Sequence, residues 1–371
     1  MANRYWVGGS TTWNATAGTK WAATSGGAGG QSVPTASDDV FFDGASGAAF
    51  VSLGTGNPTC RNLTCTGFVG TIDNGGGGGL TVNGNLVNGA GMTWNNFDAT
   101  NELYLGASGS ITTAGGTLPR FRVAVGVTAT LADAFNGSGQ FFCEGTFTTN
   151  NFNFTAGTFS LASGATVNMG SSLFTLNGAG TTTGSWTAST GSTVNAGTST
   201  IKSTASTGSV QCDFGGKTYN IVWFDRGANA NFIRIDGSST FGTFRDTGTV
   251  AHEIRFLNSS TQTITNWLVS GSAGQLITIR STGSSSTHNL VKAGGGVVSS
   301  DYLAIQYSLA SPGSTWYAGA NSTNITGNTG WIFTPPPALP SVKTFNGLAN
   351  ASIKTVEGLA IASVKSINGL S

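Results

Sequence analysis

Four short stretches decide the fold expected for this chain: FIRID (232–236), EIRFL (253–257), LITIR (276–280) and DYLAI (301–305). Each alternates apolar with polar residues, as a half-buried strand does. A second apolar position precedes each stretch by a nearly constant interval. The paired positions are Tyr219 with Ile233, Phe241 with Ile254, Ile264 with Ile277, and Leu290 with Leu303.

The first members of these pairs recur with a period in the low to middle twenties, which is typical of a solenoid. Because the repeat is rich in strand formers, we expect an all-β, single-stranded parallel β-helix with neighbouring strands about 4.8 Å apart. Ile233, Ile254 and Ile277 should form an inward-facing core ladder. A set of β-sandwich domains is the alternative, but sandwich hairpins do not explain the constant interval within the pairs.

The segment 151–176 agrees with this interpretation. Phe152, Phe159, Val167 and Phe174 are almost evenly spaced, which predicts three short faces in each turn from Phe152 to Phe174. We expect a Trp-rich N-terminal cap at 1–44, a β-helical shaft of about 13 turns at 45–333, a Pro-rich linker at 334–340 and three 11-residue repeats at 341–371.

Composition restricts the functional classes. Charged residues make up 8% of the 371 residues, against about 25% in an ordinary soluble domain, while 57 glycines favour turns. The net charge of +1 without a basic block argues against a nucleic-acid partner. No run of about 18 apolar residues predicts a membrane span, and MANRYWVGG lacks the pattern of a signal peptide.

Candidate chemistry is sparse. Cys60, Cys65, Cys143 and Cys212 lack metal-ligand spacing, and His252 and His288, expected at the surface, have no obvious triad partners. We therefore expect no cofactor, no metal and no catalytic residues, although Asp38, Asp39 and Asp43 could bind calcium. Paired carboxylates of a glycosidase would have to come from the acids on neighbouring turns, Asp225, Asp236, Asp246 and Glu253, which corner positions explain more simply.

The ends of the chain resemble known proteins. RYWVGG, the spaced Trp6, Trp13 and Trp21, and PTASDDVFFD with Asp39 and Asp43 resemble an N-terminal module of right-handed parallel β-helix proteins from phage virions and bacterial surfaces. CRNLTC (60–65) resembles the strand that follows it, and the WYAG and NTGWIF motifs resemble the end of such helices. These tryptophans and aspartates should cap the helix, which otherwise exposes unpaired strands.

The C-terminal repeats are similar to K-x-x-N-G-L-A-x-A-S repeats at the ends of phage structural proteins. Each unit contains a tight-turn signal such as Asn346-Gly347, so we expect short β-hairpins for assembly or docking; a flexible tail is the alternative. The expected docking residues are Val342, Phe345, Asn346, Gly347, Leu348, Ile353, Val356, Leu359, Val364, Ile367 and Leu370.

These resemblances imply a phage virion structural protein made in the host cytoplasm, a tail fibre or tailspike-like rod that contacts the host surface. A capsid or neck decoration protein is the first alternative, and a polysaccharide depolymerase is the second. A bacterial adhesin is less favoured because the signal pattern is missing. The expected partners are copies of the chain itself, as a homotrimer, other virion proteins, and a glycan of the host surface.

Overall fold

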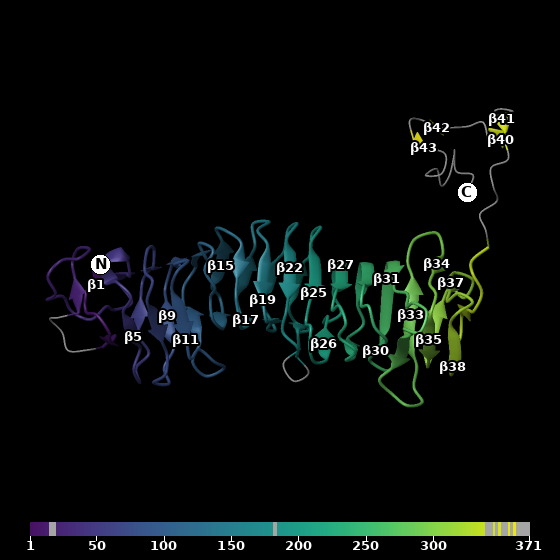
Figure 1. Cartoon of the computed structure of the whole chain (residues 1–371), viewed down its shortest axis with the longest axis horizontal. Helices are drawn as coiled ribbons and strands as arrows, with labels where there is room; N and C mark the ends of the chain where they lie inside the picture. The colour runs from purple at the N-terminus through teal and green to yellow at the C-terminus, as the bar shows by residue number, and fades with distance from the viewer. Residues whose placement is uncertain are drawn as a thin grey trace.

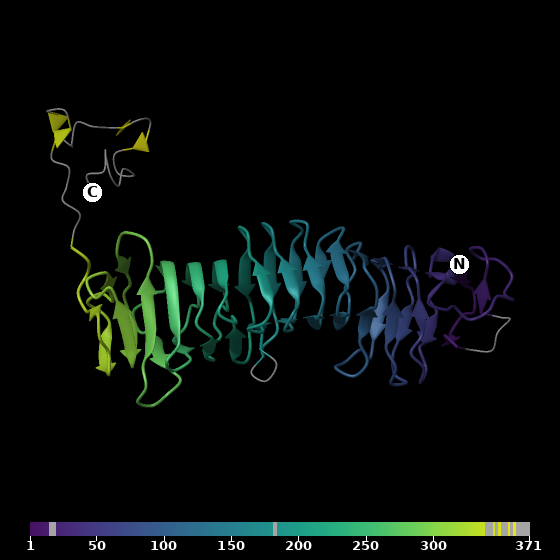
Figure 2. The same ribbon diagram turned by 180° about the vertical axis from the view of Figure 1, so that it is seen from behind.

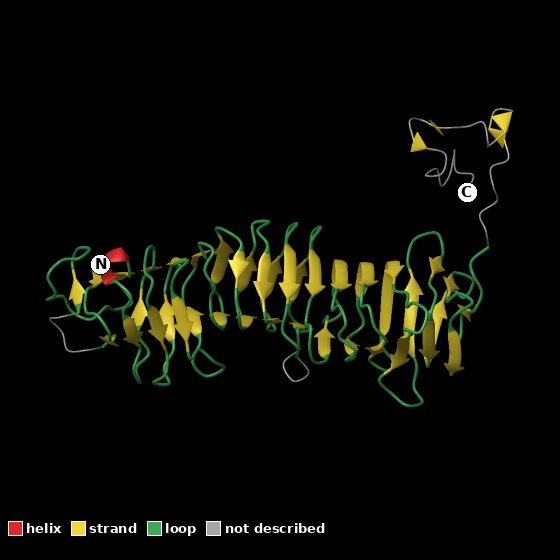
Figure 3. Cartoon of the chain, in the orientation of Figure 1, coloured by secondary structure: helices red, strands yellow, loops and turns green. Residues whose placement is uncertain are grey.

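The computed structural model describes residues 1–14, 20–180 and 184–337, together with the backbone of four short strands between 344 and 360. The strands stack into an elongated solenoid of about 13 turns, seen from its two sides in Figures 1 and 2. Strands dominate, and the described part contains one short 3₁₀ helix, η1 (Gly44–Ser46), near the N-terminus (Figure 3). The expected parallel β-helix is therefore confirmed.

One sheet runs along nearly the whole shaft. This 13-stranded sheet consists of β6 (Thr59–Cys60), β9 (Leu80–Val82), β12 (Leu103–Leu105), β14 (Phe121–Val123), β17 (Gln140–Cys143), β20 (Thr158–Leu161), β23 (Trp186–Ala188), β26 (Val210–Asp213), β28 (Ile233–Asp236), β30 (His252–Phe256), β32 (Ile277–Ser281), β35 (Leu303–Gln306) and β38 (Thr323–Thr326). At about 4.8 Å per strand it is about 60 Å long.

The other faces change along the shaft. A ten-stranded sheet contains β3 (Trp21–Ala22), β1 (Asn3–Trp6), β4 (Asp39–Phe41), β7 (Leu63–Thr64), β10 (Leu86–Val87), β13 (Gly109–Thr112), β15 (Thr128–Leu131), β18 (Thr146–Thr148), β21 (Thr166–Asn168) and β24 (Thr193–Asn195). A four-stranded sheet contains β2 (Thr11–Thr12), β5 (Phe50–Ser52), β8 (Thr71–Asp73) and β11 (Thr93–Asn95).

A nine-stranded sheet begins where the four-stranded sheet has ended. It contains β16 (Phe135–Asn136), β19 (Phe154–Ala156), β22 (Leu173–Leu176), β25 (Thr200–Ser203), β27 (Thr218–Phe224), β29 (Thr240–Asp246), β31 (Thr261–Leu268), β33 (His288–Lys292) and β36 (Ser308–Ser311). Three more strands, β34 (Val298–Ser299), β37 (Trp316–Tyr317) and β39 (Trp331–Ile332), form a small sheet near the C-terminal end. Turns around residue 160 thus have three short strands, whereas turns around residue 240 have two long ones.

Aromatic side chains stack along the interior. In the 13-stranded sheet the rings of Phe121, Phe141, Phe159 and Trp186 follow one another at 5.4, 5.7 and 4.7 Å between centroids. Phe135, Phe154 and Phe174 form a second column on the nine-stranded sheet, with spacings of 4.8 and 4.9 Å. In-register parallel pairing puts equivalent residues one above the other, so each ring packs on the ring of the previous turn.

The observed register corrects three expected positions. Ile233 pairs with Ile254, but the next residue in that column is Ile279, because Ile277 pairs with His252 and Leu303. Ile277 is still buried, in the adjacent inward column. Leu290 likewise lies outside the column of Ile264, because it pairs with Gln262.

The third correction concerns the turn that ends at Phe174. Phe154 pairs with Phe174 and is buried, whereas Phe152 is 39% exposed, so this turn is shorter than the sequence spacing suggested. Along the 13-stranded sheet the turn that leads from Phe141 to Phe159 is short, and the next turn, from Phe159 to Trp186, is much longer. The additional residues of a long turn lie in the corners between strands, so the number of residues in a turn varies more than expected.

A tight glycine run adjusts one corner. In the GGGGG segment at 75–79, a Cβ added at Gly76 would lie 2.0 Å from the carbonyl oxygen of Gly54. One added at Gly78 would lie 1.7 Å from the carbonyl oxygen of Gly56. Only glycine permits this backbone approach between successive turns.

The N-terminal end is closed by aromatic residues. Trp6, Trp13, Trp21 and Phe42 are buried and pack together with centroid distances of 5.0 to 6.0 Å. The indole N–H groups of Trp6 and Trp21 form hydrogen bonds within the cap: Trp6 donates to Gly9 O and Trp21 to Trp13 O. β3 lies antiparallel on β1, whereas β1 already pairs parallel with β4. The coil therefore begins inside the segment 1–44.

The C-terminal end of the shaft has its own tryptophan cluster. Trp267, Trp316 and Trp331 pack edge to face at 5.7 and 5.1 Å. The last strand of the 13-stranded sheet, β38, differs from this packed interior because all four of its residues are exposed. This strand is the free edge of the sheet.

Two of the three C-terminal repeats contain antiparallel strand pairs. β40 (Thr344–Phe345) pairs with β41 (Leu348–Ala349), and β42 (Thr355–Val356) pairs with β43 (Leu359–Ala360). In each pair two residues separate the strands, as in the expected hairpins. The third repeat lies outside the described residues.

We predict that Ile254→Ala lowers the free energy of unfolding by about 2–5 kcal/mol, because it leaves a cavity in the core column. Ile254→Asp should cost more, since it buries an unpaired charge. Thr263→Ala on the outer face is the control and should change stability by about 0.5 kcal/mol or less. Denaturant titration followed by circular dichroism measures all three. Equal stabilities of the Ile254 variants and the wild type would contradict an inward-facing column.

Candidate ligand-binding groove

Register also aligns side chains on the outside of the shaft. On the 13-stranded sheet, Tyr104, Arg122, Phe142, Ser160 and Thr187 occupy successive strands in one outward-facing column. They alternate with buried residues such as Phe121 and Phe141. The same pairing that builds the core thus builds a line of aromatic, cationic and hydroxyl groups on the surface.

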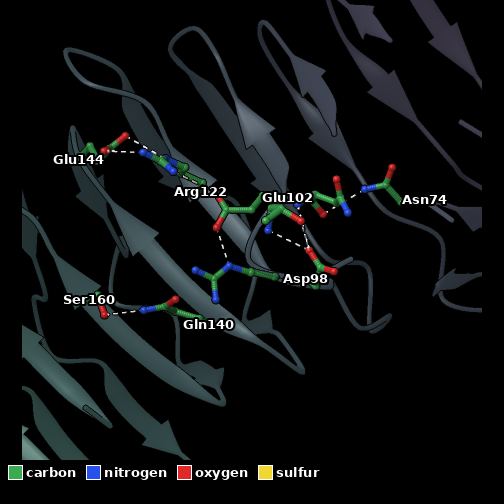
Figure 4. Close-up of polar contacts among 10 residues, drawn as sticks. Asn74, Asp98, Glu102, Arg122, Gln140, Glu144 and Ser160 are labelled. Carbon is green, nitrogen blue, oxygen red and sulfur yellow. Dashed lines mark hydrogen bonds and ion pairs between the residues drawn. The ribbon is translucent and has the colours of Figure 1, made fainter. Parts of the chain in front are cut away.

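Arg122 is the centre of an ion-pair network (Figure 4). Its Nε donates to Glu144 Oε2 at 2.9 Å, its Nη2 to Glu144 Oε1 at 2.6 Å, and its Nη1 to Glu102 Oε2 at 3.3 Å. Arg120 Nε donates to the second carboxylate oxygen of Glu102, whose side chain is 8% exposed. The hydrogen bonds that Arg122 donates to Glu144 raise the pKa of Arg122. Two acids and two bases therefore hold one another in fixed positions.

An open groove lies beside this network. Its volume is about 440 Å³, and Arg122, Phe142, Gln140, Ser160 and Thr187 contribute to its wall. The Arg122 guanidinium is 4.9 Å from the centroid of the Phe142 ring, which stacks it between the ring and the carboxylates. Gln140 Nε2 donates to Ser160 Oγ at 2.7 Å, as drawn in Figure 4.

This lining suits a ligand rich in hydroxyl groups. Carboxylates accept hydrogen bonds, guanidinium and amide groups donate them, and hydroxyls do both. The half-buried Phe142 adds an apolar face. The wall includes Glu102, Arg120 and Arg122, and in the network as a whole the two arginines are balanced by Glu102 and Glu144. We name this groove the N-terminal groove.

The four acids considered for catalysis each lie near a basic group. Asp225 pairs with Lys202 at 2.7 Å and Asp236 with Arg234 at 2.9 Å. Glu253 contacts Arg255 and Arg280. The hydrogen bond from Lys202 lowers the pKa of Asp225, which keeps this carboxyl ionised at neutral pH. Asp225 therefore lacks the raised pKa of a glycosidase acid.

The fourth acid, Asp246, belongs to a buried ion pair. His252 Nε2 lies 3.2 Å from Asp246 Oδ2, and the two side chains are 2% and 1% exposed. The other ring nitrogen, Nδ1, lies 2.9 Å from the carbonyl oxygen of Val250. Both ring nitrogens face acceptors, so His252 fits as an imidazolium. Burial lowers its pKa, but Asp246 and the Val250 carbonyl outweigh burial and raise it overall.

His288 is buried in the opposite charge state. Its Nε2 lies 3.0 Å from Ser308 Oγ, which also accepts a hydrogen bond from Trp331 Nε1. The ring stacks on Phe256 at 4.8 Å. Burial lowers its pKa to about 3, so His288 is neutral at ordinary pH. The expectation that both histidines lie at the surface is wrong, because both occupy inward positions of their strands.

The other candidate residues have structural contacts. Asp39 binds Arg61 and Asn62, Asp43 caps η1, and Asp38 accepts hydrogen bonds from Ala2 and Thr35. These carboxylates hold the first turn together. The four cysteines are free and buried, and burial raises the pKa of Cys143 and of Cys212 to about 12. The described residues contain no cluster of three potential metal ligands.

Several expected docking residues lie outside the described part of the chain. They are Val342, Asn346, Gly347, Ile353, Val364, Ile367 and Leu370. For Phe345, Leu348, Val356 and Leu359 only the antiparallel backbone pairing is described. Among the described residues no helix is long and apolar enough to cross a membrane.

Sequence analysis missed the N-terminal groove, although one signal was present. Glu102, Arg122 and Glu144 follow one another at intervals close to a single turn of the coil, which places opposite charges on neighbouring turns. No protein-family model matches the chain, and comparisons with curated proteins and with solved structures give no match either. The function must therefore be argued from the shaft and its surface.

The buried His252–Asp246 pair predicts how stability depends on pH. The pKa of His252 is raised on folding, so its contribution is complete below about pH 6.5 and is lost as the pH rises through the folded-state value. We expect the free energy of unfolding to fall as the pH rises from about 6.5 towards about 8, and to fall less in His252→Gln. Denaturant titrations across this range measure both proteins.

His288 supplies the contrast to this experiment. Its lowered pKa means that stability is lost as the pH falls from about 6.5 towards 3, because the unfolded chain takes up the proton first. A His252→Gln protein should keep this acid-side loss. Identical pH dependence of the variant and the wild type above pH 6 would show that Asp246 and His252 are not coupled.

Proposed function

We propose that this protein is a structural and adhesive component of a phage particle. It would be a β-helical rod of the tail-fibre or tailspike kind, assembled as a homotrimer, that contacts a glycan of the host surface. The resemblance of its two shaft ends and of its C-terminal repeats to virion proteins supports the particle assignment. The observation that carries the adhesive role is the N-terminal groove on the outer face of the continuous sheet.

The shaft is suited to such a role physically. One core of stacked aromatic and aliphatic columns runs through it, and tryptophan clusters lie at both ends. A core that is continuous over about 60 Å resists bending. A rigid rod can present a groove at a fixed distance from its point of attachment. The Pro-rich segment 334–340 and the repeats at 341–371 would supply that attachment.

The arrangement favours binding over cutting of a polysaccharide. Hydrolysis of a glycosidic bond needs one carboxyl group that donates a proton and a second carboxylate nearby. Glu102 is paired with Arg120 and Arg122, Glu144 is paired with Arg122, and Asp225 is held ionised by Lys202. Release of reducing sugar from host capsule by the purified protein would assign it instead to depolymerases.

The position on the particle distinguishes a fibre from a capsid or neck decoration protein. We predict that a chain ended after Phe333 remains folded, because the described core is complete by Trp331. It should lose its oligomeric state and its place on the particle, because the repeated units gain strength by multivalency. Light scattering measures the first loss and cryo-electron microscopy of complemented phage the second.

Two outcomes would change this view. A shortened chain that assembles and incorporates normally would reduce residues 334–371 to a tail without an assembly role. Full-length protein located on the capsid or neck would favour the decoration function over the tail fibre.

We also predict that Phe142→Ala weakens binding of the full-length protein to host cells about tenfold. The substitution removes the apolar face of the N-terminal groove and the stacking partner of Arg122. Phe152→Ala is the matched control, because Phe152 is an exposed phenylalanine elsewhere on the shaft. A cell-binding titration with labelled protein compares them. Equal weakening by both substitutions would show that the N-terminal groove is not the contact surface.

A further inference from the structure

Three arginines stand one above another further along the same sheet. Arg234 pairs with Arg255, and Arg255 pairs with Arg280, so their side chains project from successive strands about 4.8 Å apart. Like charges directly opposite each other destabilise a sheet. Together with Arg120 and Arg122, five of the nine arginines in the chain lie on this one face.

Carboxylates compensate this stack incompletely. Asp236 pairs with Arg234 at 2.9 Å. Glu253 forms ion pairs with both of the other arginines. It is paired closely with Arg255, while Arg280 Nη1 lies 3.7 Å from Glu253 Oε1. Three guanidinium groups therefore share two carboxylates, and Arg280 has the loosest contact. All three arginine side chains are about one-third exposed, so a ligand can reach them.

The interior beneath the stack adds positive charge. Arg226 is 3% exposed and donates to the carbonyl oxygens of Asn231 and Gly208. His252 fits as an imidazolium paired with Asp246. Five cationic groups, with Arg226 and His252 among them, thus face three carboxylates, and Asp213 on the neighbouring strand is a fourth. The network beside the N-terminal groove has two arginines and two glutamates, whereas the second region has five cationic groups and four carboxylates.

A groove of about 460 Å³ opens at this place. Its wall includes Asn231, Phe232, His252, Arg255 and Thr278. The Arg255 guanidinium lies 3.9 Å from the centroid of the Phe232 ring, which fixes its plane. An aromatic ring, a fixed guanidinium, an amide and a hydroxyl are the same types of group as in the N-terminal groove, but here they occur in a positive field.

We propose that this second groove binds the acidic group of a polysaccharide, with Arg255 in its wall and Arg280, the neighbour of Arg255 on the adjacent strand, as the anion-binding residues. A guanidinium presents two parallel N–H donors to a carboxylate, sulfate or phosphate group. The N-terminal groove would hold uncharged parts of the same polymer, because both grooves lie on one continuous sheet. This inference names the ligand class of the adhesive role proposed above and rests on that role.

The test uses the full-length protein and defined oligosaccharides. Isothermal titration calorimetry measures binding of oligogalacturonate, of the same oligomer with its carboxyl groups reduced, and of a heparin-derived sulfated oligomer. A DNA duplex reports binding of any polyanion. The variants are Arg280→Gln, Arg255→Gln and Arg280→Lys, with Arg245→Gln as the charge-matched control. Arg245 lies on the nine-stranded sheet, 4.4 Å from the Trp223 ring. Circular dichroism establishes that each variant is folded.

The proposal expects at least one acidic oligomer to bind about tenfold or more tightly than the reduced one. Arg280→Gln should abolish most of this difference, Arg280→Lys should keep part of it, and Arg245→Gln should keep all of it. A preference for oligogalacturonate or for the sulfated oligomer identifies the acidic group.

Three results would overturn the proposal: equal binding of acidic and reduced oligomers, equal loss in Arg245→Gln and Arg280→Gln, or DNA binding as tight as oligosaccharide binding. The failure of the virion role is recognised separately. Acidic-glycan binding by a protein absent from the particle would leave the second groove standing and remove the phage assignment. A protein that is present on the particle but binds acidic and reduced oligomers equally would keep the phage assignment and remove the proposed role of the second groove.

Discussion

The whole structure depends on one constraint, the in-register stacking of each turn on the turn below. Backbone hydrogen bonds set the spacing, and an inward side chain then has to pack on the inward side chain of its neighbour. Phe121, Phe141, Phe159 and Trp186 satisfy this condition with stacked rings. The same register acts on the outside, where it aligns Arg122 with Phe142 and Arg255 with Arg280. The same strand pairing therefore determines both which side chains stack in the core and which lie side by side on the surface.

Both candidate binding grooves, with their polar and charged side chains, lie on the outer face of the 13-stranded sheet. The other sheets begin or end part-way along the shaft, whereas this sheet runs through nearly all of its turns. Its outer columns are therefore the longest lines of side chains that the described sheets offer to a linear ligand. Both grooves lie on it. A polymer lying along the sheet would meet them in sequence.

Much of the fold could be predicted from the sequence, because alternation and spacing carry the register directly. The paired series through Tyr219 and Ile233 corresponds to the two long strands of each late turn. The slips at Ile277 and Leu290 could not be foreseen, because corner insertions change the step between turns without leaving a periodic mark. The inward position of His252 follows from its alternation with Ile254 and Phe256, which here overrides the usual surface preference of histidine. The network of Glu102, Arg122 and Glu144 could not be predicted without the number of residues in each local turn, because that number decides which residues of neighbouring turns lie side by side.

The two ends of the shaft are unequal, and this gives the rod a polarity. At the N-terminal end the sheet edges are the two-residue strands β2, β3 and β6, and β3 runs antiparallel over buried tryptophans. At the C-terminal end β38 presents four exposed residues on a free edge. Short edges discourage strand addition, whereas an open edge accepts it. Strand addition between shafts is therefore favoured at β38 and disfavoured at the N-terminal end, which disfavours head-to-tail stacking through the sheet edges.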